Sequence, residues 1–229
     1  MRPVWRFGIL ATIAIVAAHL LDGWAWHHLG RDGVYDRDMG RLLRIIGYYP
    51  LWLAMGLAVW LETRSRRQGL LLALVPGVAG LAAEVLKLLI RRERPAPHDG
   101  AYVFRAFTDQ PWSTKMLGLP SSHALVAFGG AWMLCKLYPR ARMVWLLLAA
   151  GCALTRVEAR AHFLSDVTAG AVAAWVVVEL CWRRWGGESE VGSRKSEVGS
   201  RKSEVGSQKS GVESRMRLLR TSTRTLPQR

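Results

Sequence analysis

Residues 69–90 read GLLLALVPGVAGLAAEVLKLLI, an apolar run that indicates the fold class. A helix of this length extends about 33 Å, which matches the hydrocarbon core of a lipid bilayer. Only two of its side chains, Glu84 and Lys87, carry a charge. An apolar run of this length with so few charges predicts a helix that spans a membrane.

Five further apolar runs lie on either side of this one, so the sequence predicts an all-α protein built as a six-transmembrane-helix bundle. We expect the first run to remain as an uncleaved anchor, because no small-x-small cleavage site precedes a polar stretch. In chain order, the expected spans are 4–23, 45–61, 69–90, 121–138, 142–155 and 163–182.

The composition divides the chain into an apolar part and a basic tail. Hydrophobic residues make up 51% of the 229 residues, although the net charge is +15. Residues 183–229 hold 12 Lys and Arg, 5 Asp and Glu, and only 9 hydrophobic residues. They repeat SEVGSRK with a period of seven, but one Val per unit provides no coiled-coil seam. We therefore expect a membrane domain over residues 1–182 and a low-complexity, disordered tail over 183–229.

An even number of spans places both ends of the bundle on the same side of the membrane. The short links at 62–68 and 139–142 are rich in arginine, and the tail adds further positive charge. Positive residues in short loops favour the cytoplasm, so we expect cytoplasmic termini. The remaining loops would then face the periplasmic, or extracytoplasmic, side of a bacterial inner (plasma) membrane.

The first group of candidate site residues ends the third span. Glu84, Lys87, Arg91 and Arg94 follow one another at spacings of three, four and three, which place them on one face of a helix. Ionisable residues inside a span are costly and require a function or a partner. The plain alternative is a Glu84–Lys87 pair whose long side chain reaches toward the interface.

The second group, Pro120-Ser121-Ser122-His123, stands directly before the fourth span. Serine is a favourable residue at the start of a helix, where free backbone N–H groups and the helix dipole attract an anion. His123 would lie beside such an anion. An ordinary helix cap with an uninvolved histidine is the alternative.

The third group contains Thr155, Arg156, His162 and Asp166. His162 and Asp166 are four residues apart at the start of the sixth span, so they share one helix face. A carboxylate at this spacing can orient an imidazole and stabilise its cation. Together the three groups offer cations for an oxyanion and two histidines, which is what phosphoryl transfer requires.

The order of these groups resembles the three-part signature of the type 2 phosphatidic acid phosphatases. This family also includes bacterial undecaprenyl-diphosphate phosphatases and vanadium haloperoxidases. Its pattern is Lys-x6-Arg-Pro, Pro-Ser-Gly-His and Ser-Arg-x5-His-x3-Asp, and the resemblance covers residues 84–166. Ser122 stands in place of the family's glycine and Thr155 in place of its first serine. The first change keeps a backbone amide and the second keeps a hydroxyl.

The resemblance implies a role for each site residue. His162 would attack phosphorus and form a phosphohistidine, Asp166 would fix the tautomer of His162, and His123 would protonate the leaving oxygen. The phosphate-binding residues would be Lys87, Arg94, Ser121, Ser122 and Arg156. The family's chemistry implies neither a metal nor another cofactor. The acidic side chains of the first loop are a candidate cation site, but we expect them to be solvated: Asp32, Asp36 and Asp38.

The resemblance therefore implies a metal-independent lipid phosphatase that hydrolyses a phosphomonoester or diphosphate headgroup while the lipid chain stays in the bilayer. Phosphatidate, phosphatidylglycerophosphate, undecaprenyl diphosphate and lipid A phosphates are all compatible substrates. The expected partners are a lipid phosphate and the membrane, with no nucleic acid, and the sequence does not indicate an oligomeric state.

Three alternatives stay open at this point. The chain could be a lipid phosphotransferase, in which an acceptor hydroxyl replaces water, or a non-catalytic membrane protein with a degenerate site. A vanadate-dependent haloperoxidase uses the same residues, but six apolar spans argue against that soluble class of enzyme.

Overall fold

The computed structural model describes residues 4–186, and within this range the fold is all-α, as the sequence predicts. The tail expected over 183–229 lies outside the described residues from residue 187 onward. The α-helices are α1 (Val4–Leu29), α2 (Asp38–Ile45), α3 (Tyr49–Thr63), α4 (Arg66–Ile90), α5 (Ser122–Leu137), α6 (Arg142–Glu158) and α7 (Leu164–Cys181). Short helical turns are η1 (Val34–Asp36), η2 (Ala96–His98), η3 (Pro139–Ala141) and η4 (Trp182–Gly186).

Each of the six expected spans corresponds to one of the longer helices, but not all of these helices have the length of a span. Three described helices are long and apolar enough to cross a membrane: Trp5–Leu29, Arg66–Ile90 and Leu164–Gly186. A fourth crossing requires that α2 and α3, which meet at a bend of 66°, form one broken span. Helices α5 and α6 have 16 and 17 residues, fewer than the roughly 20 that a bilayer core requires. The structure thus supports a membrane protein, whereas the count of six spans stays a prediction.

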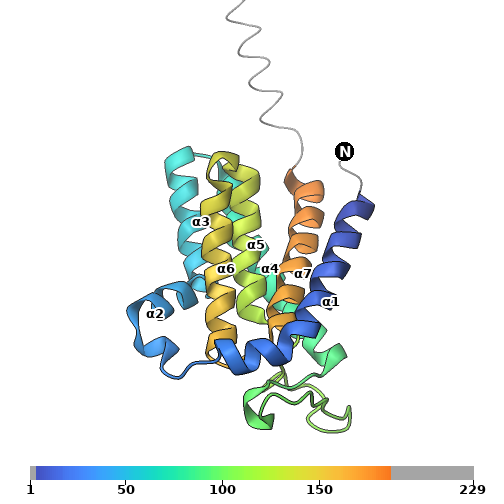
Figure 1. Cartoon of the computed structure of the whole chain (residues 1–229). Helices are drawn as coiled ribbons and strands as arrows, with labels where there is room; N and C mark the ends of the chain where they lie inside the picture. The colour runs from blue at the N-terminus through green and yellow to red at the C-terminus, as the bar shows by residue number, and fades with distance from the viewer. Residues whose placement is uncertain (1–3, 187–229) are drawn as a thin grey trace, which may run out of the picture. The chain divides into compact units, whose positions relative to one another are not determined.

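Helix α5 is the central element of the bundle and packs against α4, α6 and α7, as Figure 1 shows. Small residues allow this close packing. A Cβ added to Gly130 would lie 2.2 Å from the ring of Trp52 on α3, so any side chain there would displace the ring. Around this centre, α3 packs against α4, α1 against α7, and α2 against α6.

A long connection over residues 91–121 covers one end of the bundle (Figure 1). Arg91 ends α4 in the left-handed conformation, and its buried guanidinium holds the connection in place. It donates to four backbone carbonyls, those of Arg105, Ala106, Asp109 and Pro111. Because a buried charge must be compensated by hydrogen bonds, these carbonyls fix the path of the loop that leads to Ser121.

The same connection contains a second charged anchor. Glu93 accepts hydrogen bonds from Arg105 Nε at 2.8 Å, and its other carboxylate oxygen lies 2.6 Å from His98 Nε2. The Arg105 hydrogen bond, followed by that of His98, lowers the pKa of Glu93. Two isolated β-bridges, between Arg92 and Phe104 and between Glu93 and Leu117, complete the packing of this loop.

Candidate active site

His162 lies in the short loop between α6 and α7, and its side chain is almost fully buried. Its Nδ1 is 3.5 Å from Oδ2 of Asp166, as the spacing of four residues predicts. At this distance the contact is an ion pair when the imidazole is protonated, and Nδ1 has no hydrogen-bond partner among residues 4–186. Burial lowers the pKa of His162 to about 4, so the imidazole is neutral near pH 7. A neutral imidazole is the nucleophilic form.

The carboxylate of Asp166 is fully buried and held by several groups. Its Oδ2 accepts a hydrogen bond from the backbone N–H of Phe163 at 2.9 Å. Its Oδ1 accepts a hydrogen bond from the guanidinium of Arg92, which also donates to Ser165 Oγ at 2.7 Å. A buried carboxylate needs an opposite charge nearby, and Arg92 provides it. Arg92 was not predictable from the sequence as a site residue, because the contact joins residues 74 positions apart.

A second buried carboxylate, Asp22 of α1, extends this network. Asp22 accepts hydrogen bonds from the backbone N–H of Ser165 at 2.8 Å and from the hydroxyl of Tyr102 at 2.7 Å. Burial and the neighbouring Asp22 raise the pKa of Tyr102, which keeps the hydroxyl protonated and able to donate. Arg92 also lies 3.2 Å from Nε2 of His19. The first helix is thereby tied to the residues that hold Asp166.

Lys87, which is buried, joins α4 to the first turn of α5. Its Nζ donates to Glu84 Oε1 at 2.8 Å and contacts the hydroxyl of Ser122, which in turn donates to Glu84 at 2.6 Å. The Glu84–Lys87 pair considered as the plain alternative therefore exists. It also lies at the helix start that carries His123.

Ser121 is the residue before α5, and its hydroxyl makes no capping hydrogen bond. Its backbone N–H donates to the carbonyl of Asp166 at 3.1 Å, so this amide is already used. The amides that remain for an anion are those of the first helical turn, beginning with Ser122, because first-turn N–H groups lack partners within a helix. The contact also fixes the start of α5 against the start of α7.

Several buried polar atoms near these residues have no hydrogen-bond partner within the described part of the chain. Buried polar groups are normally paired, so such a cluster marks a place where a ligand binds. Burial, followed by the charge of Arg156, lowers the pKa of Arg94. Most members are hydrogen-bond donors, which suits an oxyanion. They are Nε of Arg44, Arg94 and Arg156, Oγ of Ser121 and Nε2 of His123.

Tyr35, in the turn η1, is a second residue whose contact with the site was not predictable from the sequence. Its hydroxyl accepts a hydrogen bond from the guanidinium of Arg156 at 2.7 Å and donates to the carbonyl of Thr155 at 3.2 Å. Arg156 is thereby oriented by a side chain more than 100 residues away. Nothing in the sequence around Tyr35 signals this contact.

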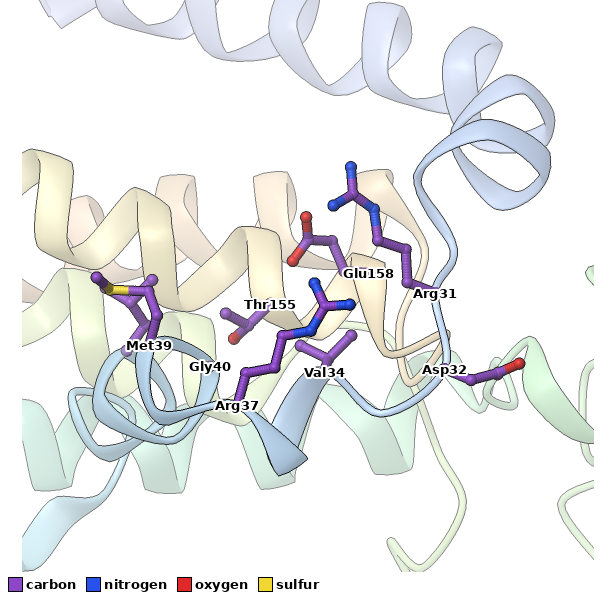
Figure 2. A pocket seen from close by; sticks show the side chains of 9 residues that line it. Arg31, Asp32, Val34, Arg37, Met39, Gly40, Thr155 and Glu158 are labelled. Atoms are coloured by element: carbon purple, nitrogen blue, oxygen red, sulfur yellow. The ribbon is translucent and has the colours of Figure 1, made fainter.

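The acidic residues of the first loop point to separate partners. Asp32 lies 3.5 Å from Arg160, and Asp38 lies 3.8 Å from Arg41. Among the described residues, no three His, Cys, Asp or Glu side chains form a group that could hold a metal ion. A pocket of about 160 Å³ opens beside this loop, and Figure 2 shows Arg31, Arg37 and Glu158 around it.

Comparisons with known proteins identify the family of the chain. Residues 68–189 match the model of the PAP2 superfamily. A lipid A 1-phosphatase of Rhizobium etli is 37% identical over 190 residues, which cover 74% of this chain and 81% of that protein. A lipid A 1-phosphatase of Rhizobium johnstonii is 37% identical over 102 residues, or 42% of this chain and 40% of that protein.

A solved structure shares the fold. It is the crystal structure of a transmembrane PAP2-type phosphatidylglycerolphosphate phosphatase from Bacillus subtilis, with a TM-score of 0.57 and 21% identity. The match covers 79% of this chain and 94% of the solved chain. The family match spans more than half of the sequence and includes all three motifs. The chain therefore belongs to the PAP2 superfamily.

Proposed function

We propose that this protein is an integral membrane lipid phosphatase that works through a phosphohistidine at His162. The proposal is carried by a cluster of buried donors around the two histidines, in a chain of the PAP2 superfamily. These donors have no hydrogen-bond partner among residues 4–186. Both curated relatives are lipid A 1-phosphatases, so a phosphate on a lipid-linked sugar is the first substrate to test. Other phosphomonoester and diphosphate headgroups present the same reacting group.

His162 would attack through Nε2, because its Nδ1 faces Asp166. A P–N bond forms while the bond from phosphorus to the leaving oxygen breaks, and that oxygen keeps the electron pair and takes a proton from His123. Water then attacks phosphorus, returns a proton to His123 and breaks the P–N bond, which releases phosphate. Asp166 stabilises the positive charge on His162 in both steps.

The phosphoryl group would be held by Lys87, Arg94 and Arg156 together with the first-turn amides of α5. These cations balance the charge that develops on the three non-reacting oxygens. Glu84 now accepts a hydrogen bond from Lys87 at 2.8 Å, so an incoming phosphate would compete with Glu84 for that lysine.

The arrangement in the bilayer is also a proposal. The site lies at the end of the bundle that carries the loop 91–121, and the start of α1 lies at the other end (Figure 1). With six spans and cytoplasmic termini, this end faces the periplasmic side of a bacterial inner membrane. The catalytic domain would be residues 1–182, in agreement with a compact unit that ends at Trp185, and the basic tail would not contribute to catalysis.

Phosphate release from purified protein tests the proposal. The substrates are phosphatidate, phosphatidylglycerophosphate, undecaprenyl diphosphate and lipid A. We expect the native chain to release phosphate from at least one of them, and His162→Ala to release none. His27→Ala is the matched control, because His27 is exposed on α1. Full release by His162→Ala would contradict the mechanism. Labelled phosphate on a second lipid would instead identify a phosphotransferase, and halide peroxidation with vanadate would identify a haloperoxidase.

A further inference from the structure

The segment between α1 and α3 reaches the active site from outside the part of the chain that matches the family. The match begins at residue 68, whereas η1 and α2 lie between residues 34 and 45. Helix α2 packs against α6, which carries Arg156 in its last turn. Side chains of this segment are therefore placed to act on the site without being part of the family signature.

Arg44, near the end of α2, is held between two aromatic rings. Its guanidinium carbon lies 4.5 Å from the centre of the Tyr35 ring and 5.6 Å from that of Tyr48. Such cation–π contacts fix a guanidinium without neutralising its charge. Its Nε is buried and has no hydrogen-bond partner within residues 4–186. A buried guanidinium N–H without an acceptor can donate a hydrogen bond to a bound anion.

The end of α2 lies on the His123 side of the site. Tyr48 meets the His123 ring edge to face, with 5.1 Å between the ring centres. Gly47 packs so closely on the same histidine that an added Cβ would come within 2.8 Å of His123 Cβ. The backbone N–H of Gly47 donates to the carbonyl of Arg44 at 3.0 Å, so Arg44 is one turn from this contact.

We infer that Arg44 binds an anionic leaving group, namely the inner phosphate of a lipid diphosphate. The inference rests on the proposed function, in which His123 protonates the leaving oxygen. In a diphosphate, the bond from the terminal phosphorus to the bridging oxygen breaks, and the bridging oxygen keeps the electron pair. His123 supplies a proton to that oxygen, and the inner phosphate departs with the lipid. The Arg44 guanidinium then balances the remaining charge of the inner phosphate.

In a monophosphate of the same lipid, the leaving oxygen belongs to a neutral alcohol or sugar, so Arg44 has no anion to bind on that side. Arg44 therefore sets the preference between diphosphate and monophosphate, while Lys87, Arg94 and Arg156 serve both. A prenyl diphosphate and a glycolipid diphosphate share this chemistry, and each is one arm of the test.

The test compares kcat/KM of the full chain in detergent on matched pairs, farnesyl diphosphate with farnesyl phosphate and lipid A 1-diphosphate with lipid A 1-phosphate. We expect Arg44→Gln to lower kcat/KM on the diphosphate about 10- to 100-fold more than on the monophosphate, as for a lost hydrogen bond to a charged group. The pair of lipids on which Arg44→Gln has the larger effect identifies the class of lipid, prenyl or glycolipid. Arg37→Gln is the control, because Arg37 is exposed on the same segment. Arg37→Gln should leave the ratio of kcat/KM on the diphosphate to kcat/KM on the monophosphate unchanged.

A binding measurement supports the kinetics. Pyrophosphate should inhibit the native chain more strongly than orthophosphate, and Arg44→Lys, which keeps the charge but loses the planar fork, should weaken only pyrophosphate inhibition. If Arg44→Gln does not fold, the comparison of pyrophosphate with orthophosphate inhibition in Arg44→Lys tests the role of Arg44. An unchanged ratio in Arg44→Gln, or equal inhibition by the two anions, would overturn the inference. If the native chain releases no phosphate from phosphatidate, phosphatidylglycerophosphate, undecaprenyl diphosphate or lipid A, the proposed function itself is overturned.

Discussion

Arg92 and Asp166 form an ion pair whose side chains are only 1% and 0% exposed to solvent. The other oxygen of this carboxylate, Oδ2, faces Nδ1 of His162 and also accepts a hydrogen bond from the backbone N–H of Phe163. The Arg92–Asp166 pair therefore contacts the proposed nucleophile, His162, through Asp166. Asp166 can remain ionised in a buried site because Arg92 balances its charge, and an ionised Asp166 is what a cationic phosphohistidine requires.

Replacing Arg92 by Met should destabilise the fold, because the buried charge of Asp166 loses its partner. Removing one member of a buried ion pair costs about 3–5 kcal/mol. Thermal unfolding in detergent measures this loss. Arg183→Met is the control, since Arg183 is largely exposed and its pair with Glu179 should contribute only about 0–1 kcal/mol. Equal effects of the two substitutions would contradict a special role for the Arg92–Asp166 pair.

Asp166→Asn should lower kcat far more than it changes KM. The amide keeps the shape of the carboxylate, but it cannot stabilise an imidazolium, and we expect kcat to fall about 10²- to 10⁴-fold. Steady-state kinetics on the best lipid substrate give both constants. A rise in KM with kcat unchanged would mean that Asp166 acts in substrate binding rather than on His162.

The pH dependence of kcat/KM should show that the nucleophile stays neutral down to about pH 5. Burial lowers the pKa of His162 to about 4, so His162 loses its proton well below the usual value for histidine, and its neutral form persists from pH 5 upward. At acid pH, kcat/KM should fall as the nucleophile of the free enzyme is protonated. The midpoint of this fall should therefore lie near pH 4. Titration of the His162 imidazole by NMR with a midpoint of 6.5 or above would contradict this assignment.

Tyr35→Phe should weaken phosphate binding, because the hydroxyl orients Arg156 through a hydrogen bond of 2.7 Å. A hydrogen bond to a charged group contributes about 1.5–3 kcal/mol, so kcat/KM should fall at least about 10-fold. Inhibition by orthophosphate should weaken by a similar factor. If orthophosphate binds Tyr35→Phe as tightly as the native chain, Arg156 does not depend on Tyr35 for its position.

The sequence predicted the long helices well, because their apolar runs are a local signal. The run 69–90 lies within Arg66–Ile90, and the run 163–182 corresponds to Leu164–Cys181. Helix α1 continues six residues past the expected end at 23, since its last turns carry Trp and His side chains that interrupt the apolar run but not the helix. Helix α2 was missed, because its eight residues mix apolar and charged side chains and form no apolar run.

The site was predictable wherever its geometry is local. The spacing of four residues was enough to bring His162 and Asp166 together. The roles that the family pattern suggests for Lys87, Arg94 and Arg156 stay predictions. Arg92, Tyr35 and Arg44 escaped notice because their contacts join segments far apart in the chain. Tyr35 lies in η1 and contacts Arg156 directly, and the packing of α2 on α6 places the segment that carries Arg44 beside it.

Trapping the phosphoenzyme tests directly whether His162 is the nucleophile. A ³²P-labelled substrate mixed with the native chain and quenched in alkali should leave a label that is stable in base and lost in acid, as expected for a phosphohistidine. Peptide mass spectrometry should place this label on His162, and His162→Ala should carry none. A label on another residue, or turnover by His162→Ala, would show that His162 is not the nucleophile.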